Sequence, residues 1–203
     1  MKILFEDKNI IVCVKPRGLL SQADSGGGES MVSRLCEHTK GEVYPLHRLD
    51  REVGGVMVYA KTRQAAATLS KQISEHSLKK EYIALVNGQP DKASGEMRDL
   101  LFKDSRKNKS YVVKRERKGV KEAVLEYNLI EKGDAYSKVL ILLHTGRTHQ
   151  IRVQFASRKM PLAGDRKYGA SDDFKFIGLW SYRITFAHPM TNETISFCEE
   201  ADF

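Results

Sequence analysis

The chain has 203 residues, 41% of them hydrophobic, and its 34 Lys and Arg against 26 Asp and Glu give a formal net charge of +8. This apolar fraction is too high for a disordered basic tail, and no window approaches the ~18 consecutive apolar residues of a membrane helix. The first eight residues carry charges where a signal peptide needs an apolar run. The three cysteines fit neither a disulfide framework nor a zinc ribbon. We therefore expect a cytoplasmic protein with no membrane partner.

The amino-terminal part of the chain predicts short strands and two helices. Strands are predicted over residues 3–5, 10–14, 56–60 and 82–86, and one helix around residues 30–38. Thr62 can cap a second helix, whose apolar face would contain Ala66, Leu69, Ile73 and His76. The glycine-rich residues 25–28 predict a plain loop, because no strand precedes them and the lysine and hydroxyl of a nucleotide-binding loop are missing.

The carboxy-terminal part again predicts more strand than helix. The basic residues 98–121 predict a strand pair with a mobile, charged connection, and Thr148 can cap a helix from His149 to about Arg158. Further strands are predicted over 124–130, 139–143, 179–186 and 194–197. Because the strands come in hairpin-spaced pairs, we expect a single α+β domain over residues 1–203, with a mixed, mostly antiparallel sheet flanked by helices.

Positive charge is concentrated in two stretches of the chain. Residues 98–121 hold ten Lys or Arg against three acidic residues, and residues 146–168 hold six against one, so the rest is net acidic. Such segregation indicates a positive surface for a polyanion, whose phosphates would supply affinity and salt dependence. A solvated lysine-rich hairpin is the alternative that charge alone leaves open.

The first candidate site is the run His-Arg-Leu-Asp-Arg at residues 47–51, which Gly54 and Gly55 follow. Arg48 and Arg51 flank Asp50 and favour its ionised form, while the glycines allow the backbone to turn beside it. An aspartate in such a loop could act as a nucleophile, a base or a metal ligand. It could equally form one side of a structural salt bridge.

The second candidate site is residues 144–152, His-Thr-Gly-Arg-Thr-His-Gln-Ile-Arg. Gly146 permits a turn, and the first turn of the helix that follows would offer amide N–H donors. His149 and Arg152 are three residues apart and would share one face of that helix. The planar guanidinium of Arg152 could hold a carboxylate bidentately or bind a phosphate. The alternative is an ordinary helix start with surface cations.

Patterns for metal, nucleotide or serine chemistry are not found. The six histidines show no His-x₃-His spacing, and no acidic cluster lies near His144 and His149. There is no Gly-x-Ser-x-Gly motif, and neither a dinucleotide-binding nor a P-loop fingerprint is present. We therefore expect no metal and no cofactor.

Both candidate sites resemble motifs of the RluA-like pseudouridine synthases. Residues 47–50 with the glycine turn are similar to the catalytic motif of that family, and residues 145–152 with 161–169 are similar to its second long motif. Further similar segments, in the same order, are 14–18 (Val-Lys-Pro-Arg-Gly), 80–88 (Lys-Glu-Tyr-Ile-Ala-Leu-Val-Asn-Gly) and 186–189 (Phe-Ala-His-Pro). These collinear matches cover nearly the whole chain, which is identified on them as a member of the family.

The resemblance implies the pseudouridine synthase fold, an active-site cleft across the sheet, and an isomerase that converts a uridine within RNA to pseudouridine. It implies that Asp50 is the essential carboxylate, that Arg152 pairs with it and orients it, and that Tyr82 stacks on the target base. Residues implied to contact the substrate are Lys15, Arg48, Arg147, His149 and Leu179. A base inside a stem is inaccessible, so the nucleotide must be flipped out. The expected partner is a stem-loop of rRNA, tRNA or both, bound by a monomer.

The chain departs from the family pattern at two places. Residues 53–55 are Val-Gly-Gly where the family usually has Thr-Ser-Gly, and residues 179–181 are Leu-Trp-Ser where relatives often have Leu-His-Ala. The last glycine of the first motif is kept, so we expect the loop to survive with the loss of hydroxyl contacts. A non-catalytic RNA-binding or ribosome-assembly factor on the same scaffold is the alternative function. Asp50 with Arg152 favours the enzyme, because an RNA-binding module has no need of this pair.

Overall fold

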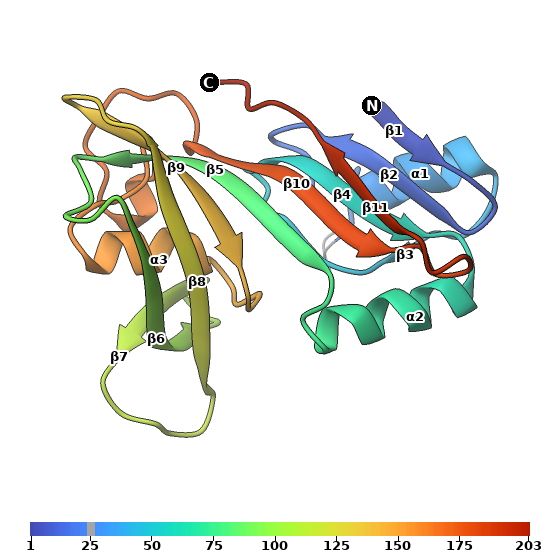
Figure 1. Ribbon diagram of the computed structural model, residues 1–203, viewed down its shortest axis with the longest axis horizontal. Coiled ribbons are helices and arrows are strands. Elements are labelled where there is room, and N and C mark those ends of the chain that lie inside the picture. The colour runs from blue at the N-terminus through green and yellow to red at the C-terminus, as the bar shows by residue number, and fades with distance from the viewer. Residues whose placement is uncertain (24–26) are drawn as a thin grey trace. The chain divides into compact units, whose positions relative to one another are not determined.

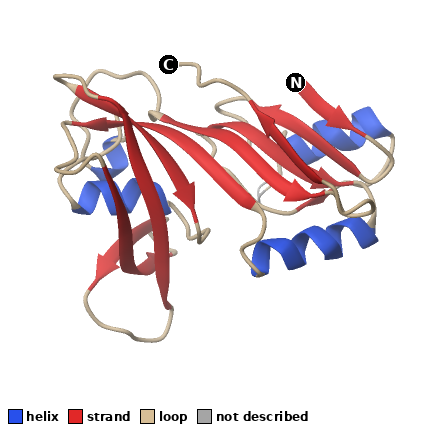
Figure 2. Ribbon diagram, in the orientation of Figure 1, coloured by secondary structure: helices blue, strands red, loops and turns tan. Residues whose placement is uncertain are grey.

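The computed structural model describes residues 1–23 and 27–203, which form two compact units (Figure 1). The first unit comprises Met1–Lys80 and Trp180–Asp202, and the second comprises Glu81–Leu179 with Phe203. Strands predominate over helices in both units (Figure 2). Ser25 and Gly26 of the predicted glycine-rich loop lie outside the described residues.

The sheet of the first unit has the strand order β1-β2-β4-β10-β11, and the short β3 also pairs with β4. Its strands are β1 (Lys2–Glu6), β2 (Ile10–Lys15), β3 (Tyr44–Pro45), β4 (Gly54–Ala60), β10 (Leu179–Ala187) and β11 (Thr194–Cys198). The β4–β10 pair is parallel, whereas the pairs β1–β2, β2–β4, β3–β4 and β10–β11 are antiparallel. The predicted hairpin of β1 and β2 is confirmed, and the Asp7 carboxylate in its turn accepts from the N–H groups of Asn9 and Ile10 at 2.7 Å.

Both predicted helices of the first unit are confirmed. Helix α1 (Met31–Thr39) begins after Ser30, whose side chain caps it. Helix α2 (Arg63–Ser74) begins after Thr62, whose Oγ1 accepts from the Ala65 N–H at 3.2 Å. The two caps satisfy amide donors that the first helical turns leave unpaired.

The core of the first unit lies between α2 and the sheet. Ala65 and Leu69 of α2 pack with strand residues Ile10, Val12, Val56, Val58, Ala60, Ile184 and Phe186. The predicted apolar face is confirmed for Ala66, Leu69 and Ile73, which are buried or partly buried against this core, and Ala65 joins them. It is wrong at His76, which lies beyond the helix. His76 is exposed and has a φ of 58°, so it belongs to the turn that leads out of α2.

The second unit contains an antiparallel sheet with the strand order β5-β9-β8-β6-β7. Its strands are β5 (Lys79–Asn87), which starts in the first unit, β6 (Ser94–Asp104), β7 (Lys109–Val113), β8 (Val120–Glu131) and β9 (Tyr136–Leu143). The predicted basic strand pair is confirmed as β6 and β7. Its connection is a short turn in which the Asp104 carboxylate accepts from the N–H groups of Arg106 and Lys107. Helix α3 (Gln150–Ser157) packs on β6 and β7 through Val153 and Leu101, and a 3₁₀ turn, η1 (Arg166–Tyr168), follows it.

The predicted cap of α3 is wrong. The cap position is His149, with a left-handed φ of 52° and no capping hydrogen bond from its side chain. Thr148 makes its contact here through its backbone rather than its side chain: its carbonyl accepts from the Ser110 hydroxyl at 2.6 Å. The predicted α+β class with a mostly antiparallel sheet is confirmed. No helix of the described residues combines the length and apolar character that crossing a membrane requires.

Candidate active site

Asp50 lies in a tight turn directly before β4. The Val53 N–H donates to the Asp50 carbonyl at 3.0 Å and closes the turn. Arg51 fastens the turn to the segment after β2, because its carbonyl accepts from the Gly18 N–H at 2.9 Å and its Nε donates to the Gly18 carbonyl at 2.9 Å. Asp50 is half-buried, whereas Arg48 is exposed. The backbone therefore fixes the position from which the Asp50 carboxylate projects.

Gly55 is required where the turn enters the sheet. Its φ is +120°, which L side chains rarely adopt, and a Cβ there would collide with the backbone of Ser181. The glycine that is kept from the family motif thus allows β4 to lie directly against β10. The prediction that the loop survives the changes at residues 53 and 54 agrees with this geometry.

Two residues that precede Asp50 in the sequence anchor its segment in the first unit. The Nε2 atom of His47 accepts from the Val58 N–H at 3.4 Å, and its enclosed Nδ1 has no hydrogen-bond partner among the described residues. Burial, with a smaller effect of the Lys80 charge, lowers the pKa of His47 to about 3, so the imidazole is neutral. Leu49 is buried, and the Ser21 hydroxyl bonds both its N–H and its carbonyl at 3.0 Å.

Lys15 lies under this turn rather than on the surface. It is fully buried, and its ammonium donates to the carbonyls of Pro16 (2.9 Å), Leu19 (2.7 Å) and Arg51 (3.1 Å). Burial lowers its pKa to about 8, against the opposing effect of the Glu52 and Asp50 carboxylates. This environment does not fit the predicted contact of Lys15 with an RNA phosphate. The residue instead ties the segment after β2 to the turn that carries Asp50.

Arg152 is buried in α3 of the second unit. Its Nε and Nη2 atoms donate to the two carboxylate oxygens of Asp165 at 2.7 and 2.8 Å, and both side chains are almost fully enclosed. This bidentate pair holds the plane of the guanidinium in one orientation. The predicted pairing of Arg152 with Asp50 remains a prediction, because these residues belong to different units.

Tyr168 of η1 connects several residues of the second candidate segment. Its ring lies 5.2 Å from the Arg152 guanidinium carbon and packs edge-on against the His149 ring at 5.6 Å. Its hydroxyl lies 2.9 Å from His149 Nδ1 and accepts from the Ser110 N–H at 2.8 Å. His149 and Arg152 both contact Tyr168, but His149 lies at the cap position of α3 rather than on the helix face that the sequence predicted.

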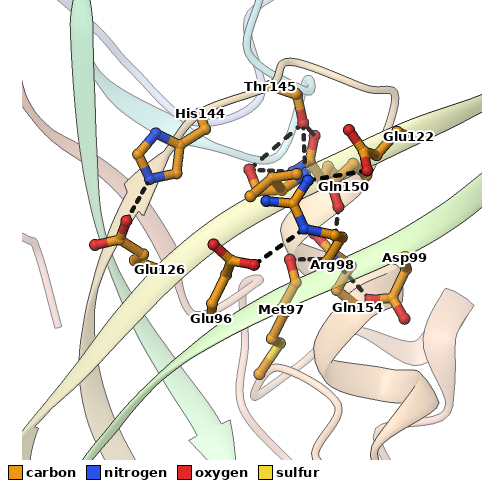
Figure 3. Close-up of polar contacts among 12 residues, drawn as sticks. Glu96, Met97, Arg98, Asp99, Glu122, Glu126, His144, Thr145, Gln150 and Gln154 are labelled. Atoms are coloured by element: carbon orange, nitrogen blue, oxygen red, sulfur yellow. Dashed lines mark hydrogen bonds and ion pairs between the residues drawn. The ribbon is translucent and has the colours of Figure 1, made fainter.

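The segment 144–149 is held to β8 by a network of side-chain hydrogen bonds (Figure 3). The Gln150 Oε1 accepts from Thr145 Oγ1 at 2.7 Å and from the Arg147 N–H at 3.0 Å, while its Nε2 donates to the Val124 carbonyl at 3.1 Å. Thr145 Oγ1 in turn accepts from the Val124 N–H at 2.9 Å. Arg147 is half-buried, and its Nε donates to the Glu122 carbonyl at 2.8 Å. Gln150, Asp165 and Tyr168 were not among the predicted site residues.

Tyr82 and Leu179 are both in the buried part of the second unit. Tyr82 lies in β5 opposite Ile141 of β9 and is 5% exposed. Leu179 begins β10 and is also 5% exposed. Their predicted contacts with the target base remain predictions.

The two basic stretches differ in how much of their charge is on the surface. Nine of the ten cations at 98–121 are exposed, and Lys109 is half-buried. In 146–168, Arg152 is buried and Arg147 half-buried, so only the remaining four cations are exposed. The second stretch therefore contributes less surface charge than its sequence predicts. Among residues 1–23 and 27–203, no three His, Cys, Asp or Glu side chains gather as metal ligands would.

Comparison with known proteins gives the family. Residues 9–157 match the RNA pseudouridylate synthase family. The chain is 34% identical over 213 residues to the ribosomal large subunit pseudouridine synthase C of Buchnera aphidicola, with 99% of this chain and 67% of that protein covered. It is 35% identical over 217 residues to the ribosomal large subunit pseudouridine synthase D of Neisseria meningitidis, covering 97% of this chain and 57% of that protein. The chain thus spans about half to two thirds of the length of these curated relatives.

The fold is also that of solved pseudouridine synthase structures. Human RNA pseudouridylate synthase domain containing 1 superposes with a TM-score of 0.82 at 22% identity, over 100% of this chain and 84% of the human one. The family match, together with this fold, defines the pseudouridine synthase class of RNA-modifying enzymes. The chain belongs to the RNA pseudouridylate synthase family.

Proposed function

We propose that this protein isomerises a specific uridine in a structured RNA to pseudouridine, with Asp50 as the essential carboxylate. The observation that carries the proposal is the Asp50 turn, which backbone contacts, a neutral His47 and the buried Lys15 hold in place in a chain of this family. The reaction breaks the N–C glycosidic bond and forms a C–C bond without any redox change, so it needs no cofactor. Residues 1–203 would act as one catalytic domain, as a monomer in the cytoplasm.

Asp50 would attack the sugar or the base as a nucleophile, or remove a sugar proton on a glycal route. Arg152, oriented by Asp165, would pair with Asp50 and fix the direction of its carboxylate. Tyr82 would stack on the flipped base, and Leu179 would pack against it. Flipping the nucleotide out of a stem costs on the order of a few kcal/mol, which contacts to the flanking RNA would offset.

The RNA would be bound by exposed cations, chiefly those of residues 98–121. Arg48 is exposed beside Asp50 and would occupy the place of the flipped nucleotide or hold its former partner. Arg147 and His149 would contact the RNA near the start of α3. Ribosomal RNA is the first substrate to test, because both curated relatives described above carry names of ribosomal large subunit enzymes; a transfer RNA stem-loop is the second.

Replacement of Asp50 by Asn tests the proposal. On total RNA from cells that lack this protein, labelled with tritium at uridine C5, the unmodified protein should release tritium. Asp50→Asn should reduce the rate by ~10³-fold or more and still bind the RNA, because a neutral amide can neither attack nor accept the proton. Asp134→Asn, which changes an exposed carboxylate in a loop of the second unit, is the control and should keep full activity.

Two results would contradict the enzyme. An unmodified protein that binds this RNA and releases no tritium would instead support a non-catalytic RNA-binding or ribosome-assembly factor. An Asp50→Asn protein as active as the control would assign the chemistry to another residue.

A further inference from the structure

The two departures of this chain from the family pattern lie side by side in the structure. The parallel pairing of β4 and β10 places Gly54 opposite Trp180 and Gly55 opposite Ser181. A Cβ at residue 54 would collide with Cζ3 of Trp180, and it would also lie 3.0 Å from the Lys15 carbonyl. The indole therefore fits only because residue 54 has no side chain. A serine, the residue that the family usually has at this position, would displace the indole or the start of β4.

Trp180 is held in this place from two sides. It is 5% exposed, and its indole N–H donates to the Glu199 carbonyl at 2.9 Å. The guanidinium of Arg17 lies over its ring at 5.5 Å. The same guanidinium donates to the Glu52 carbonyl at 3.1 Å and to the Asp202 carboxylate at 2.8 to 3.1 Å.

These contacts end on the turn that carries Asp50. Glu52, which accepts from Arg17, lies within the turn, and Gly54, which packs on Trp180, follows it directly. The Val53 N–H between them donates to the Asp50 carbonyl. A shift of the backbone at residues 52–54 would therefore move Asp50, and misplacement by about 1 Å is enough to cost ~10²-fold in rate.

We propose that Trp180 is a positioning residue for Asp50, and that Gly54 is the small partner that makes room for it. This inference rests on the proposed function, since it concerns the carboxylate that the proposal makes essential. The opposing view is that Trp180 only fills the core. In that case its replacement would lower stability and leave the turnover of the folded protein unchanged.

A double-mutant cycle on the full chain separates the two views. Gly54→Ser should lower kcat by about 20-fold or more, and Trp180→His by about tenfold, with KM for RNA within about threefold of the unmodified value. The combined variant should recover to within about threefold of the unmodified kcat, because the smaller imidazole leaves space for the serine. Gly41→Ser is the control, since a Cβ at Gly41 meets only the Thr39 carbonyl, at 3.8 Å.

Additive losses in the combined variant would overturn the inference, and so would an unchanged kcat in Gly54→Ser. If Gly54→Ser does not accumulate as folded protein, the combined variant is compared with Trp180→His alone. Higher kcat and a higher unfolding midpoint in the combined variant support the pair, and a combined variant no better than Trp180→His overturns it.

Intrinsic fluorescence gives a readout that does not depend on turnover. The chain has 1 Trp, so the emission of the folded protein reports on Trp180 alone. Gly54→Ala should shift the emission maximum, whereas Gly41→Ala should leave it unchanged. If the unmodified protein releases no tritium, the proposed function fails, while the emission and the unfolding midpoints still test the contact between Gly54 and Trp180. An emission maximum unchanged by Gly54→Ala would overturn that contact.

Discussion

The two segments that carry the family motifs are fixed in opposite ways. Residues 47–55 are held by backbone hydrogen bonds, by the neutral ring of His47 and by the ammonium of Lys15 beneath them. Residues 144–152 are held by a network of side chains around Gln150 and by the buried ion pair of Arg152 with Asp165. In the first segment the neighbours of Asp50 hold the segment in place, whereas in the second segment Arg152 is itself one of the residues that hold it.

Because of this difference, we expect substitutions in the two segments to affect activity and stability differently. The hydrogen bond that closes the first turn uses the backbone carbonyl of Asp50, so an Asp50→Asn protein keeps that contact. A change at Arg152 or Asp165 cannot be so selective, because each would leave the other without its buried partner. Replacement of Asp50 should therefore lower activity and leave stability unchanged. Replacement of Arg152 or Asp165 should lower both.

The largest effect on stability is expected for Asp165→Asn. The amide removes the negative charge beside a buried guanidinium, and breaking a buried ion pair from one side costs about 3–5 kcal/mol. Turnover should fall as well, since Arg152 would lose its fixed orientation. Urea unfolding measures the first effect and tritium release the second.

The matched control for this ion pair is Glu122→Gln, which breaks the exposed pair of Glu122 with Arg98 in the same unit. An exposed pair contributes only about 0–1 kcal/mol, so this variant should unfold close to the unmodified protein. Equal destabilisation by the two variants would show that burial of the Arg152 pair has no energetic consequence.

A smaller, pH-dependent effect is expected from His47 in the first segment. Its pKa is lowered to about 3 in the folded protein and is near 6.5 in the unfolded chain, so below pH 6.5 the unfolded chain binds the extra proton. The associated stability is complete above pH 6.5 and is lost progressively as the pH falls toward 3. Between pH 7.5 and pH 5 this amounts to about 2 kcal/mol.

His47→Gln isolates this contribution, since glutamine can still accept from the Val58 N–H and does not titrate. The free energy of unfolding is measured with urea at pH 7.5 and at pH 5. Its decrease between these two pH values should be about 2 kcal/mol smaller in this variant than in the unmodified protein. Parallel losses in the two proteins would mean that His47 is readily protonated in the folded state.

Local sequence rules were sufficient for most of the fold. Three features depend on residues that are close together in the sequence: the hairpin of β1 and β2, the cap at Thr62 and the basic strand pair. Asp50 and its glycine turn are likewise one short motif. These features were predictable because their causes lie within a few residues of their effects.

The remaining features depend on contacts that no short pattern contains. Lysine is almost always exposed, so the burial of Lys15 could not be foreseen without the three carbonyls that converge on it. Asp165 lies 13 residues after Arg152, beyond the end of α3, and only the fold shows that the two form a pair. Gly54 and Trp180 were each noted as departures, and only the parallel pairing of their strands makes them neighbours.

The smallest effect is expected at Thr145, and it distinguishes the observed start of α3 from the predicted one. In Thr145→Val the Val124 N–H loses its acceptor and Gln150 loses a donor, which should cost about 1–2 kcal/mol in urea unfolding. Thr148→Val is the matched control, because the structure gives α3 no side-chain cap, and its cost should stay below about 0.5 kcal/mol. The predicted cap at Thr148 requires the reverse order, with a cost of about 1 kcal/mol for Thr148→Val. The variant that loses more free energy of unfolding therefore shows how the second segment is held. A larger loss in Thr145→Val indicates the network to β8, and a larger loss in Thr148→Val indicates an ordinary helix cap.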